Sequence, residues 1–514
     1  MNQIQPPVIE YAQLAPLLVV FGAAVVGVLV EAFAPRYLRK SLHMPVTLLS
    51  LIAAFVLTLW QGLQGSRNAA AMGAVAVDGA TLFIWGTILV LAAVSVLLIN
   101  DEDHFVAQAA ALPGSAEEEE SLSTGAAHTE VYPLALFAVG GMLLFPASND
   151  LLIMFVALEV MSLPLYLLCG LARRRRLLSQ EAAMKYFLLG SFSSAFFLYG
   201  TALLYGVTGT VDLGGISDAL AGIGGEDTLL YVGVATLGVG LLFKVGAAPF
   251  QAWKPDVYQG APTPITALMA SGTLVAAFGA VLRVFWVALG GLQWDWEPVM
   301  WGVAILTMIV GAILAITQTD IKRMLAYSSI AHGGFLLVGV VAIGDAAQNQ
   351  AALRGLLFYL AAYGFTTVGA FAVVTLVRDA GGEANHLSRW AGLGKRSPLL
   401  AGVFAFFLLA FAGIPLTSGF FGKYAVFAAA GGVQAWPLVV VGVLASAIAA
   451  FFYVRVIVLM FFSDPAADGP TIAVPTIGTS TVVGLAALAT VVLGIFPGPV
   501  LDLAGTAAES LFVR

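Results

Sequence analysis

Residues 236–253 read TLGVGLLFKVGAAPFQAW and place Lys244, followed five residues later by Pro249, inside one apolar segment. Residues 406–427 read FFLLAFAGIPLTSGFFGKYAVF, with Pro415 eight residues before Lys423. A lysine at the centre of a membrane helix costs about 2.5–3.5 kcal/mol, so it is seldom kept without a role. Paired hydrophobic segments interrupted by proline are typical of transport sites. Together the two stretches predict a membrane protein that moves something across the bilayer.

The composition of the 514-residue chain is that of a helical membrane protein. Hydrophobic residues make up 60% of it and charged residues only 10%, whereas a soluble domain carries about 25% charged residues. The alternation that a β-barrel requires is absent, and helices satisfy their own backbone groups in lipid. We therefore expect an all-α polytopic membrane protein with about fourteen transmembrane helices, the seventh and twelfth of them broken. They lie near 11–33, 44–62, 78–99, 131–147, 150–171, 182–207, 229–253, 264–289, 298–317, 325–343, 353–377, 399–430, 436–462 and 476–496.

Positive charges alternate between the two ends of these helices. By the positive-inside rule, the side richer in Lys and Arg faces the cytoplasm. The opposite side has little beyond Arg67, Arg354 and Arg514. We therefore expect a bacterial cell membrane protein with both termini on the non-cytoplasmic side. The cytoplasmic set comprises Arg36, Arg39, Lys40, Arg173–Arg176, Lys254, Lys322, Arg323, Arg378, Arg389, Lys395 and Arg396.

The helix count divides the chain into five parts. Because two sets of five helices would insert with opposite orientation, they have the character of inverted repeats. The acidic loop between the early helices and the first set is typical of a solvated linker rather than a docking site. Its His104 and His128 are isolated, and the single Cys169 excludes an intrachain disulfide and a cysteine-built metal site. The parts are helices 1–3 (1–100), the acidic cytoplasmic loop (101–130), the first repeat (131–290), the second repeat (297–463) and a C-terminal helix (476–514).

Several charged residues fall within the expected helices. Arg283 and Arg455 lie near helix ends, where a long side chain extends to the membrane interface, and we expect both to do so. Lys185, about one turn into its helix, fits such an extension and a functional role equally well. Glu159, Lys244 and Lys423 lie too deep in their expected helices for their side chains to reach the interface. The full set is Glu159, Lys185, Lys244, Arg283, Lys423 and Arg455.

Glu159 and Lys244 admit two interpretations. As a structural pair they would join helices 5 and 7, because two charges ~6 Å apart at an effective dielectric near 20 interact by about 3 kcal/mol. As a proton relay, Lys244 would exchange a proton under the influence of the carboxylate, which an always-charged arginine cannot do. His332, in helix 10, is a further relay candidate because histidine titrates near neutrality, although residue type alone does not decide its role.

Each proline frees one backbone carbonyl. Pro249 lacks the N–H that would bond the carbonyl of Val245, and Pro415 does the same to Phe411. Freed groups at membrane depth are tolerated where water or polar neighbours supply partners. The sequence therefore predicts polar surroundings at both breaks.

Three separated motifs resemble one known family. They read FKVGAAPFQAWKPDVYQGAPTPITA (243–267), DIKRMLAYSSIAHGGFLLVG (320–339) and GIPLTSGFFGKY (413–424). In this order they resemble the antiporter-like membrane subunits of proton-pumping NADH:quinone oxidoreductase (respiratory complex I), and KPDVYQGAPTP is most similar to the subunit N branch. The resemblance covers residues 130–465 and, by number, the flanking helices. It implies two inverted five-helix repeats that carry a proton path across the membrane.

The resemblance also implies roles for individual residues. Glu159 would be the helix 5 glutamate that tunes Lys244, and Lys185 would be the helix 6 lysine. His332 would lie in the helix 10 relay, and Lys423 would be the helix 12 lysine that leads to the exit. These five residues form the predicted proton relay.

One position departs from the family pattern. The family commonly has a further lysine on helix 8, where this chain reads ASGTLVAAFG (270–279) with Leu274 in its place. The connection between the two half-channels is therefore not specified by the motifs.

The sequence contains no nucleotide-binding loop, flavin motif or set of iron–sulfur cysteines. The resemblance thus implies a non-redox subunit that is not catalytic alone and binds no cofactor itself. FMN, iron–sulfur clusters, NADH oxidation and quinone reduction would belong to the membrane and peripheral partner subunits, and no nucleic acid is involved. Two other hypotheses stand beside this one: a subunit of a cation/proton antiporter, and a purely structural membrane scaffold.

Overall fold

The computed structural model describes residues 9–65, 67–100, 116, 128–172, 176–222, 228–344, 349–379, 382–465 and 469–509. In this part of the chain, twelve helices are long and apolar enough to cross a membrane. Two shorter apolar helices, α5 (Val131–Ala147) and α17 (Pro398–Ala412), complete the set of segments expected from the sequence. The all-α polytopic fold is therefore confirmed. Most of the acidic loop at 101–130 lies outside the described residues.

The N-terminal half contains the helices up to the first break and the central buried segment. Residues 263–288 form one continuous apolar rod in which α-helical and π-helical turns alternate. The helices are α1 (Tyr11–Phe33), α2 (Arg36–Gln64), α3 (Gly79–Ile99), α5, α6 (Leu151–Cys169), α7 (Arg176–Thr208), α8 (Leu213–Leu220), α9 (Thr228–Val245), α10 (Trp253–Gly260), α11 (Thr263–Leu268), η2 (Met269–Thr273), α12 (Leu274–Leu282) and η3 (Arg283–Ala288).

The C-terminal half contains the second break. Two short helices, α8 in the first half and α21 here, were not expected from the hydropathy pattern. The helices are η4 (Gly290–Leu292), α13 (Gln293–Ile316), α14 (Ile321–Val341), α15 (Asn349–Leu376), η5 (Leu387–Trp390), α16 (Leu393–Arg396), α17, α18 (Ser418–Gly432), α19 (Trp436–Phe462), α20 (Ile477–Ile495) and α21 (Gly498–Ala508).

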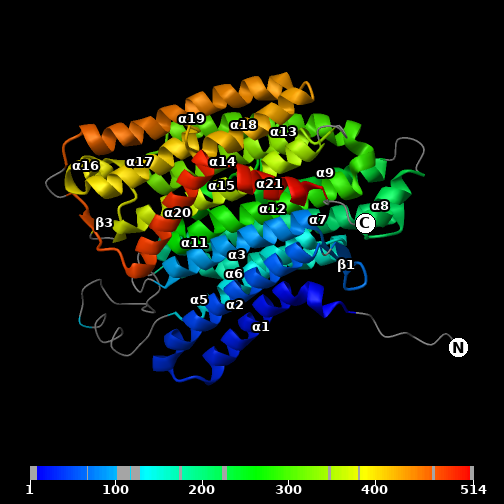
Figure 1. The fold of residues 1–514 in the computed structure, drawn as a ribbon, viewed down its shortest axis with the longest axis horizontal. Helices are drawn as coiled ribbons and strands as arrows, with labels where there is room; N and C mark the ends of the chain where they lie inside the picture. Colours follow the sequence, from blue (N-terminus) through cyan, green and yellow to red (C-terminus); the bar gives the residue numbers. More distant parts are fainter. Residues whose placement is uncertain are drawn as a thin grey trace.

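The described strands are short and close the ends of the helix bundle. β1 (Asn68–Ala70) pairs antiparallel with β2 (Val75–Val77). β3 (Val377–Asp379) pairs antiparallel with both β4 (Gly382–Glu383) and β5 (Thr471–Ile472). Figure 1 shows β1 and α8 at one end of the longest axis and β3 and α16 at the other. The helices run between these ends, so the long axis follows the membrane normal.

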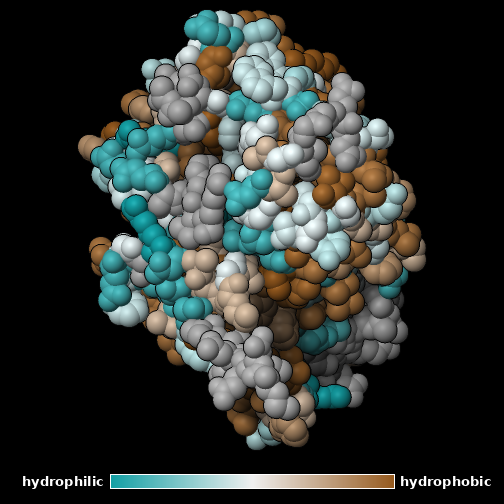
Figure 2. Space-filling model, turned by 90° about the vertical axis from the view of Figure 1, so that its right-hand side faces the viewer, coloured by the Kyte–Doolittle hydropathy of each residue, from teal (hydrophilic) through white to brown (hydrophobic). Residues whose placement is uncertain are grey.

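Burial sorts the helices into an inner and an outer group. The rod 263–288 is fully buried along its apolar window, and α14 and α15 are 94% buried along theirs. By contrast, only 33% of the corresponding window is buried in α1, α2, α19 and α20. The space-filling view of the β1 and α8 end shows hydrophilic residues over much of that face and hydrophobic ones along its right-hand edge (Figure 2). The outer helices therefore present apolar side chains to lipid, and polar groups collect at the ends.

Aspartate caps fix where several helices begin. The side chain of Asp150 accepts from two backbone N–H groups at the start of α6, and Asp320 does the same for α14. Such caps satisfy donors that a helix start otherwise leaves unpaired. The start of α2 differs from expectation, because Arg36 already begins the helix. There Arg39 and His43 reach back to Glu31 of α1, each at 2.9 Å, and hold the two helices together.

Candidate functional site: buried lysines at two broken helices

The first break lies where α9 meets a left-handed glycine. α9 ends at Val245, and Gly246 follows with φ of 77°. Pro249 lies three residues further on, and the chain resumes a helix only at Trp253. A positive φ is accessible to glycine at little cost, so the glycine ends the helix and the proline prevents its immediate continuation. The predicted break in the seventh transmembrane segment is confirmed.

Lys244 lies at the end of α9 and is only 3% exposed. Its Nζ donates to Ser162 Oγ of α6 at 2.6 Å and lies 3.4 Å from the Tyr186 hydroxyl of α7. The same Nζ lies 5.3 Å from the centre of the Tyr186 ring, within cation–π range. Neutral hydroxyls and an aromatic face thus surround this lysine.

Glu159 lies three residues before Ser162 on α6, so the two side chains share one face of that helix. Its Oε1 is buried and has no hydrogen-bond partner among the described residues. In the same part of the chain no ion pair within 4.0 Å joins it to Lys244. The structural-pair interpretation therefore lacks a direct ion pair between Glu159 and Lys244.

The freed carbonyl of Val245 accepts a hydrogen bond from Lys254 Nζ at 3.1 Å. Lys254 is only 2% exposed, which corrects its assignment to the cytoplasmic loop charges. It lies in α10, the short helix after the break, and its Nζ is 5.7 Å from the centre of the Tyr258 ring. The side chain folds back into the gap that Pro249 opens, because the carbonyl there needs a donor.

The second break repeats this construction. α17 ends at Ala412, and Gly413 follows with φ of 83°. Lys423 of α18 is 5% exposed. Its Nζ donates to the carbonyl of Phe411 at 2.9 Å, as expected for the group freed by Pro415, and to the carbonyl of Ala412 at 3.1 Å.

A hydroxyl and an aromatic ring complete the surroundings of Lys423. Its Nζ donates to Ser446 Oγ of α19 at 2.7 Å and lies 4.8 Å from the centre of the Phe335 ring. Phe335 belongs to α14, the helix that also carries His332. The second lysine therefore faces the central helix.

His332 is 1% exposed and lies between the two broken helices, because α14 packs against both α10 and α18. Its Nδ1 is 2.6 Å from the Tyr359 hydroxyl, and its Nε2 is 3.5 Å from the Tyr453 hydroxyl. Tyr453 also contacts Ser328. Phe411, whose carbonyl accepts from Lys423, places its ring centre 5.5 Å from that of His332. Imidazole, two phenols and a serine thus form one polar cluster inside the bundle.

Lys185 lies apart from the buried lysines. Its side chain is 40% exposed and forms ion pairs at 2.6 Å with Glu181 and with Asp256 of α10. Arg323 of α14 pairs with the same Asp256. Burial opposes the effect, but hydrogen bonds from Lys185 and Arg323 hold the pKa of Asp256 below its usual range. The carboxylate thereby ties α7, α10 and α14 together beneath the first break.

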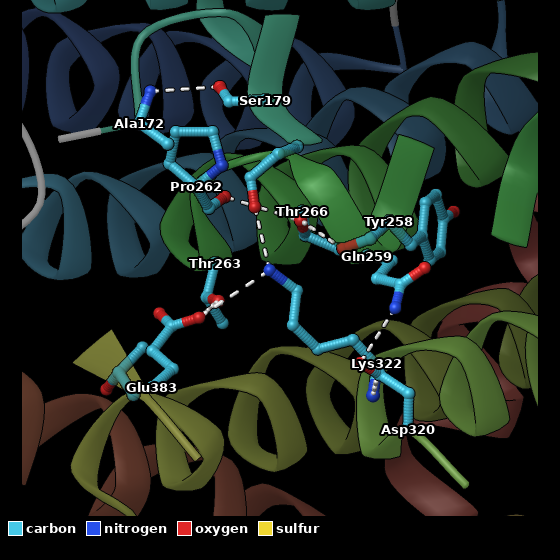
Figure 3. Close-up of polar contacts among 12 residues, drawn as sticks. Ala172, Ser179, Tyr258, Gln259, Pro262, Thr263, Thr266, Asp320, Lys322 and Glu383 are labelled. Atoms are coloured by element: carbon cyan, nitrogen blue, oxygen red, sulfur yellow. Dashed lines mark hydrogen bonds and ion pairs between the residues drawn. The ribbon is translucent and has the colours of Figure 1, made fainter. Parts of the chain in front are cut away.

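Lys322 is a second residue whose sequence assignment needs correction. Expected as a loop charge, it is 1% exposed, and its Nζ donates to the carbonyl of Ala261 at 2.7 Å. It also lies 3.6 Å from Glu383 Oε2, which accepts from the Thr263 hydroxyl at 2.5 Å. Figure 3 shows Lys322 extending from α14 towards Thr263 of α11 and Glu383 of β4. This polar cluster joins the central rod to the β3–β4 hairpin.

Arg283 does not extend to the interface, contrary to expectation. It is 1% exposed, and one of its terminal nitrogens lies 2.6 Å from Asp78 and 2.7 Å from the Thr81 hydroxyl. A buried guanidinium is retained here because the carboxylate and hydroxyl at the start of α3 satisfy it. The pair joins η3 to α3 and has a structural role.

Leu274 begins α12 and is 2% exposed, so an apolar side chain fills the place of the family's helix 8 lysine. Among the described residues, no group of three or more His, Cys, Asp or Glu could hold a metal ion. Several groups that matter escaped the sequence analysis: Lys254, Ser162, Tyr186, Tyr359, Tyr453 and Ser446.

Comparison with known proteins identifies the fold and the motifs. Residues 148–449 match the family described as NADH:quinone oxidoreductase/Mrp antiporter, TM. The chain is 62% identical to NADH-quinone oxidoreductase subunit N of Rhodococcus opacus, over 98% of this chain and 97% of that protein. A chain of respiratory complex I from Thermus thermophilus has a TM-score of 0.76 at 34% identity, over 95% of this chain and 99% of that one.

A chain of the Mrp complex from Dietzia sp. shares the fold alone, with a TM-score of 0.82 at 21% identity over 97% of each chain. The extent and identity of the first three matches confirm the resemblance carried by the three motifs. The chain therefore belongs to the NADH-quinone oxidoreductase subunit N branch of the antiporter-like membrane subunit family.

Proposed function

We propose that this chain translocates protons in the membrane arm of a proton-pumping NADH:quinone oxidoreductase. The observation that supports this most is the pair of breaks, each with a buried lysine donating to a freed carbonyl, on either side of His332. Lysine and histidine exchange protons. A chain of such groups through the bundle would let protons cross a membrane whose lipid they do not pass. The chain's relatives bear the name of a subunit of this enzyme.

Within this proposal, Glu159 tunes Lys244, and Lys244 holds the proton at the first break. His332 passes it through the centre with the Tyr359 and Tyr453 hydroxyls as neighbours, and Lys423 holds it at the second break. Lys185 is the most exposed of the predicted relay residues and exchanges protons near the polar end of α7. Five-helix units 131–290 and 297–463, in opposite orientation, would place the breaks at corresponding depths.

The redox chemistry is proposed to lie in the partner subunits. FMN and iron–sulfur clusters there oxidise NADH and reduce quinone, and this chain supplies only proton transfer. It is proposed to sit in a bacterial cell membrane among other membrane and peripheral subunits, with both termini on the non-cytoplasmic side.

The experiment compares Lys244→Ala and Glu159→Ala with the unaltered complex in proteoliposomes. NADH-driven proton uptake is measured beside quinone reduction on the same preparation. The proposal expects both variants to assemble and to lose at least tenfold in proton uptake, since losing one proton-transfer group typically costs about 10²–10⁴-fold. If both pump at the unaltered ratio, the chain is a scaffold and the proposal is wrong. If Lys423→Ala alone leaves proton uptake unchanged, only the assignment of the second half-channel is wrong.

The alternative is a subunit of a cation/proton antiporter. The matching family is described as including Mrp antiporters, and the Mrp chain has the same fold. Purification separates the two functions. A complex with flavin, iron–sulfur clusters and NADH oxidation supports the first, whereas sodium-dependent proton flux without NADH oxidation supports the second.

A further inference from the structure

The two breaks share a construction that pairs Lys254 with Lys423. In each, a half-helix ends at a glycine with positive φ, Gly246 or Gly413. In each, a lysine from the next half-helix donates to a carbonyl that the break frees. A methyl group added to Gly246 would meet Lys254 Cδ at 2.7 Å, and one added to Gly413 would meet Lys423 Cδ at 3.1 Å. Both lysine stems thus lie directly over the glycine.

This alignment leaves Lys244 without a counterpart. Lys244 lies two residues before Gly246, and the residue two before Gly413 is Phe411. The first break therefore holds two buried lysines, Lys244 before it and Lys254 after it, where the second break holds one.

Lys254 lies on the side of the first break that faces the centre. The preceding residue, Trp253, stacks on Tyr186 with ring centres 4.7 Å apart, and the Tyr186 hydroxyl meets Lys244. Lys254 Nζ reaches the Val245 carbonyl, and a methyl group added to Gly333, the residue after His332, would lie 4.0 Å from that oxygen. The amine is thus placed between the Lys244 site and His332.

A cap for the carbonyl alone does not require a charge. At the same break the carbonyl of Phe243 is satisfied by the neutral indole N–H of Trp253 at 2.9 Å. In the described part of the chain no carboxylate lies within 4.0 Å of Lys254 Nζ. An unpaired buried ammonium costs several kcal/mol, so a lysine retained here points to a use of its proton.

We infer that Lys254 is a proton-relay residue that connects Lys244 to His332, in the region where Leu274 offers no ionisable group. This inference rests on the proposed function. In the transfer, neutral Lys254 takes up one proton that Lys244 releases, and one N–H bond forms as another breaks. Protonated Lys254 then gives a proton towards the His332 side and returns to the neutral amine bonded to the Val245 carbonyl.

The test uses Lys254→Arg and Lys254→Gln in the complete complex, reconstituted in proteoliposomes. Both substitutes can still donate to the Val245 carbonyl, but arginine does not release its proton and glutamine does not carry one. NADH-driven proton uptake and quinone reduction are measured on the same preparations. The matched control is Lys395→Gln, which replaces a lysine 55% exposed at the surface. Lys244→Gln reports on the proposed function itself.

If Lys254 is a relay residue, we expect both Lys254 variants to assemble and to lose at least tenfold in proton uptake. The Lys395→Gln complex should pump as the unaltered complex does. Unaltered uptake in either Lys254 variant overturns the inference, because neither carries an exchangeable amine. Failure of both to assemble also overturns it and assigns Lys254 to structure. If Lys244→Gln is impaired while a Lys254 variant pumps normally, only the inference fails. Unaltered pumping in Lys244→Gln removes the proposed function as well.

Discussion

At the scale of single residues, Lys254 and Lys322 show why charge position in the sequence misleads. Both follow an apolar segment and were expected in loops, yet each is at most 2% exposed. Each donates to a backbone carbonyl at a point where a helix is interrupted. One signal was available for Lys254: Pro255 is typical of the first turn of a helix, so the chain resumes a helix at Trp253 rather than a loop.

The Tyr359 hydroxyl gives a residue-scale prediction, because it is the closest polar neighbour of His332 at 2.6 Å. Tyr359→Phe keeps the ring and removes the hydroxyl, so a buried ring nitrogen loses its partner, at a cost of about 1–3 kcal/mol. We expect an assembled complex whose proton uptake falls roughly tenfold. Tyr424→Phe, at a tyrosine 62% exposed, should leave uptake unchanged. Equal uptake in the two variants would remove Tyr359 from the path.

At the scale of elements, the helix breaks depend on a short local sequence and on what lies next to it. Glycine and proline set the position of both breaks, and this much is visible in the sequence. The donors that satisfy the freed carbonyls come from nine to twelve residues further along the chain, so their contacts depend on how the two half-helices pack.

Gly413 and Gly402 provide an element-scale comparison within one half-helix and its end. Gly413 has φ of 83°, and an added methyl group would lie 3.1 Å from Lys423 Cδ, whereas Gly402 has open space around it. A side chain in the left-handed region costs about 1–2 kcal/mol. Gly413→Ala should therefore lower the thermal unfolding midpoint of the complex and disturb Lys423, while Gly402→Ala should not. Identical midpoints and identical proton uptake would contradict this account of the break.

The buried pair of Asp78 and Arg283 gives a second element-scale prediction. Arg283→Met leaves a carboxylate that is fully buried without its partner, and breaking such a pair costs about 3–5 kcal/mol. We expect loss of assembled complex on heating at lower temperature. Combining it with Asp78→Asn, which keeps an acceptor for the α3 cap, should recover part of the loss. No difference between the single and double variants would mean that the buried charge is not the cause.

At the scale of the whole molecule, the expected topology can be tested by chemical labelling. Asp464 precedes α20 and Asp502 follows it, with side chains 91% and 76% exposed. Since α20 is long enough to cross the membrane, we expect the two positions to lie on opposite sides. The only native cysteine in the chain, Cys169, is buried. Labelling of an introduced cysteine can therefore be distinguished from labelling of the native one.

The two variants are labelled with a membrane-impermeant maleimide in vesicles that expose the cytoplasmic side and in vesicles that expose the other side. We expect Asp464→Cys to react only from the cytoplasmic side and Asp502→Cys only from the other side. This outcome follows from the positive charges near α16 and β3. The reverse pattern would show that the topology is inverted, and labelling of both from one side would show that α20 does not span.

The sequence by itself determined the number of membrane-spanning segments, their approximate place along the chain, the two breaks and the family, because hydropathy, glycine and proline act on their own neighbourhood. It also placed Glu159, Lys244, His332 and Lys423 among the deep ionisable or relay candidates. Only the tertiary structure decided that Arg283 pairs internally, that Glu159 stays out of contact with Lys244, and that Lys254 enters the first break. These outcomes depend on which helices pack together, since a buried charge takes the partner that folding brings to it.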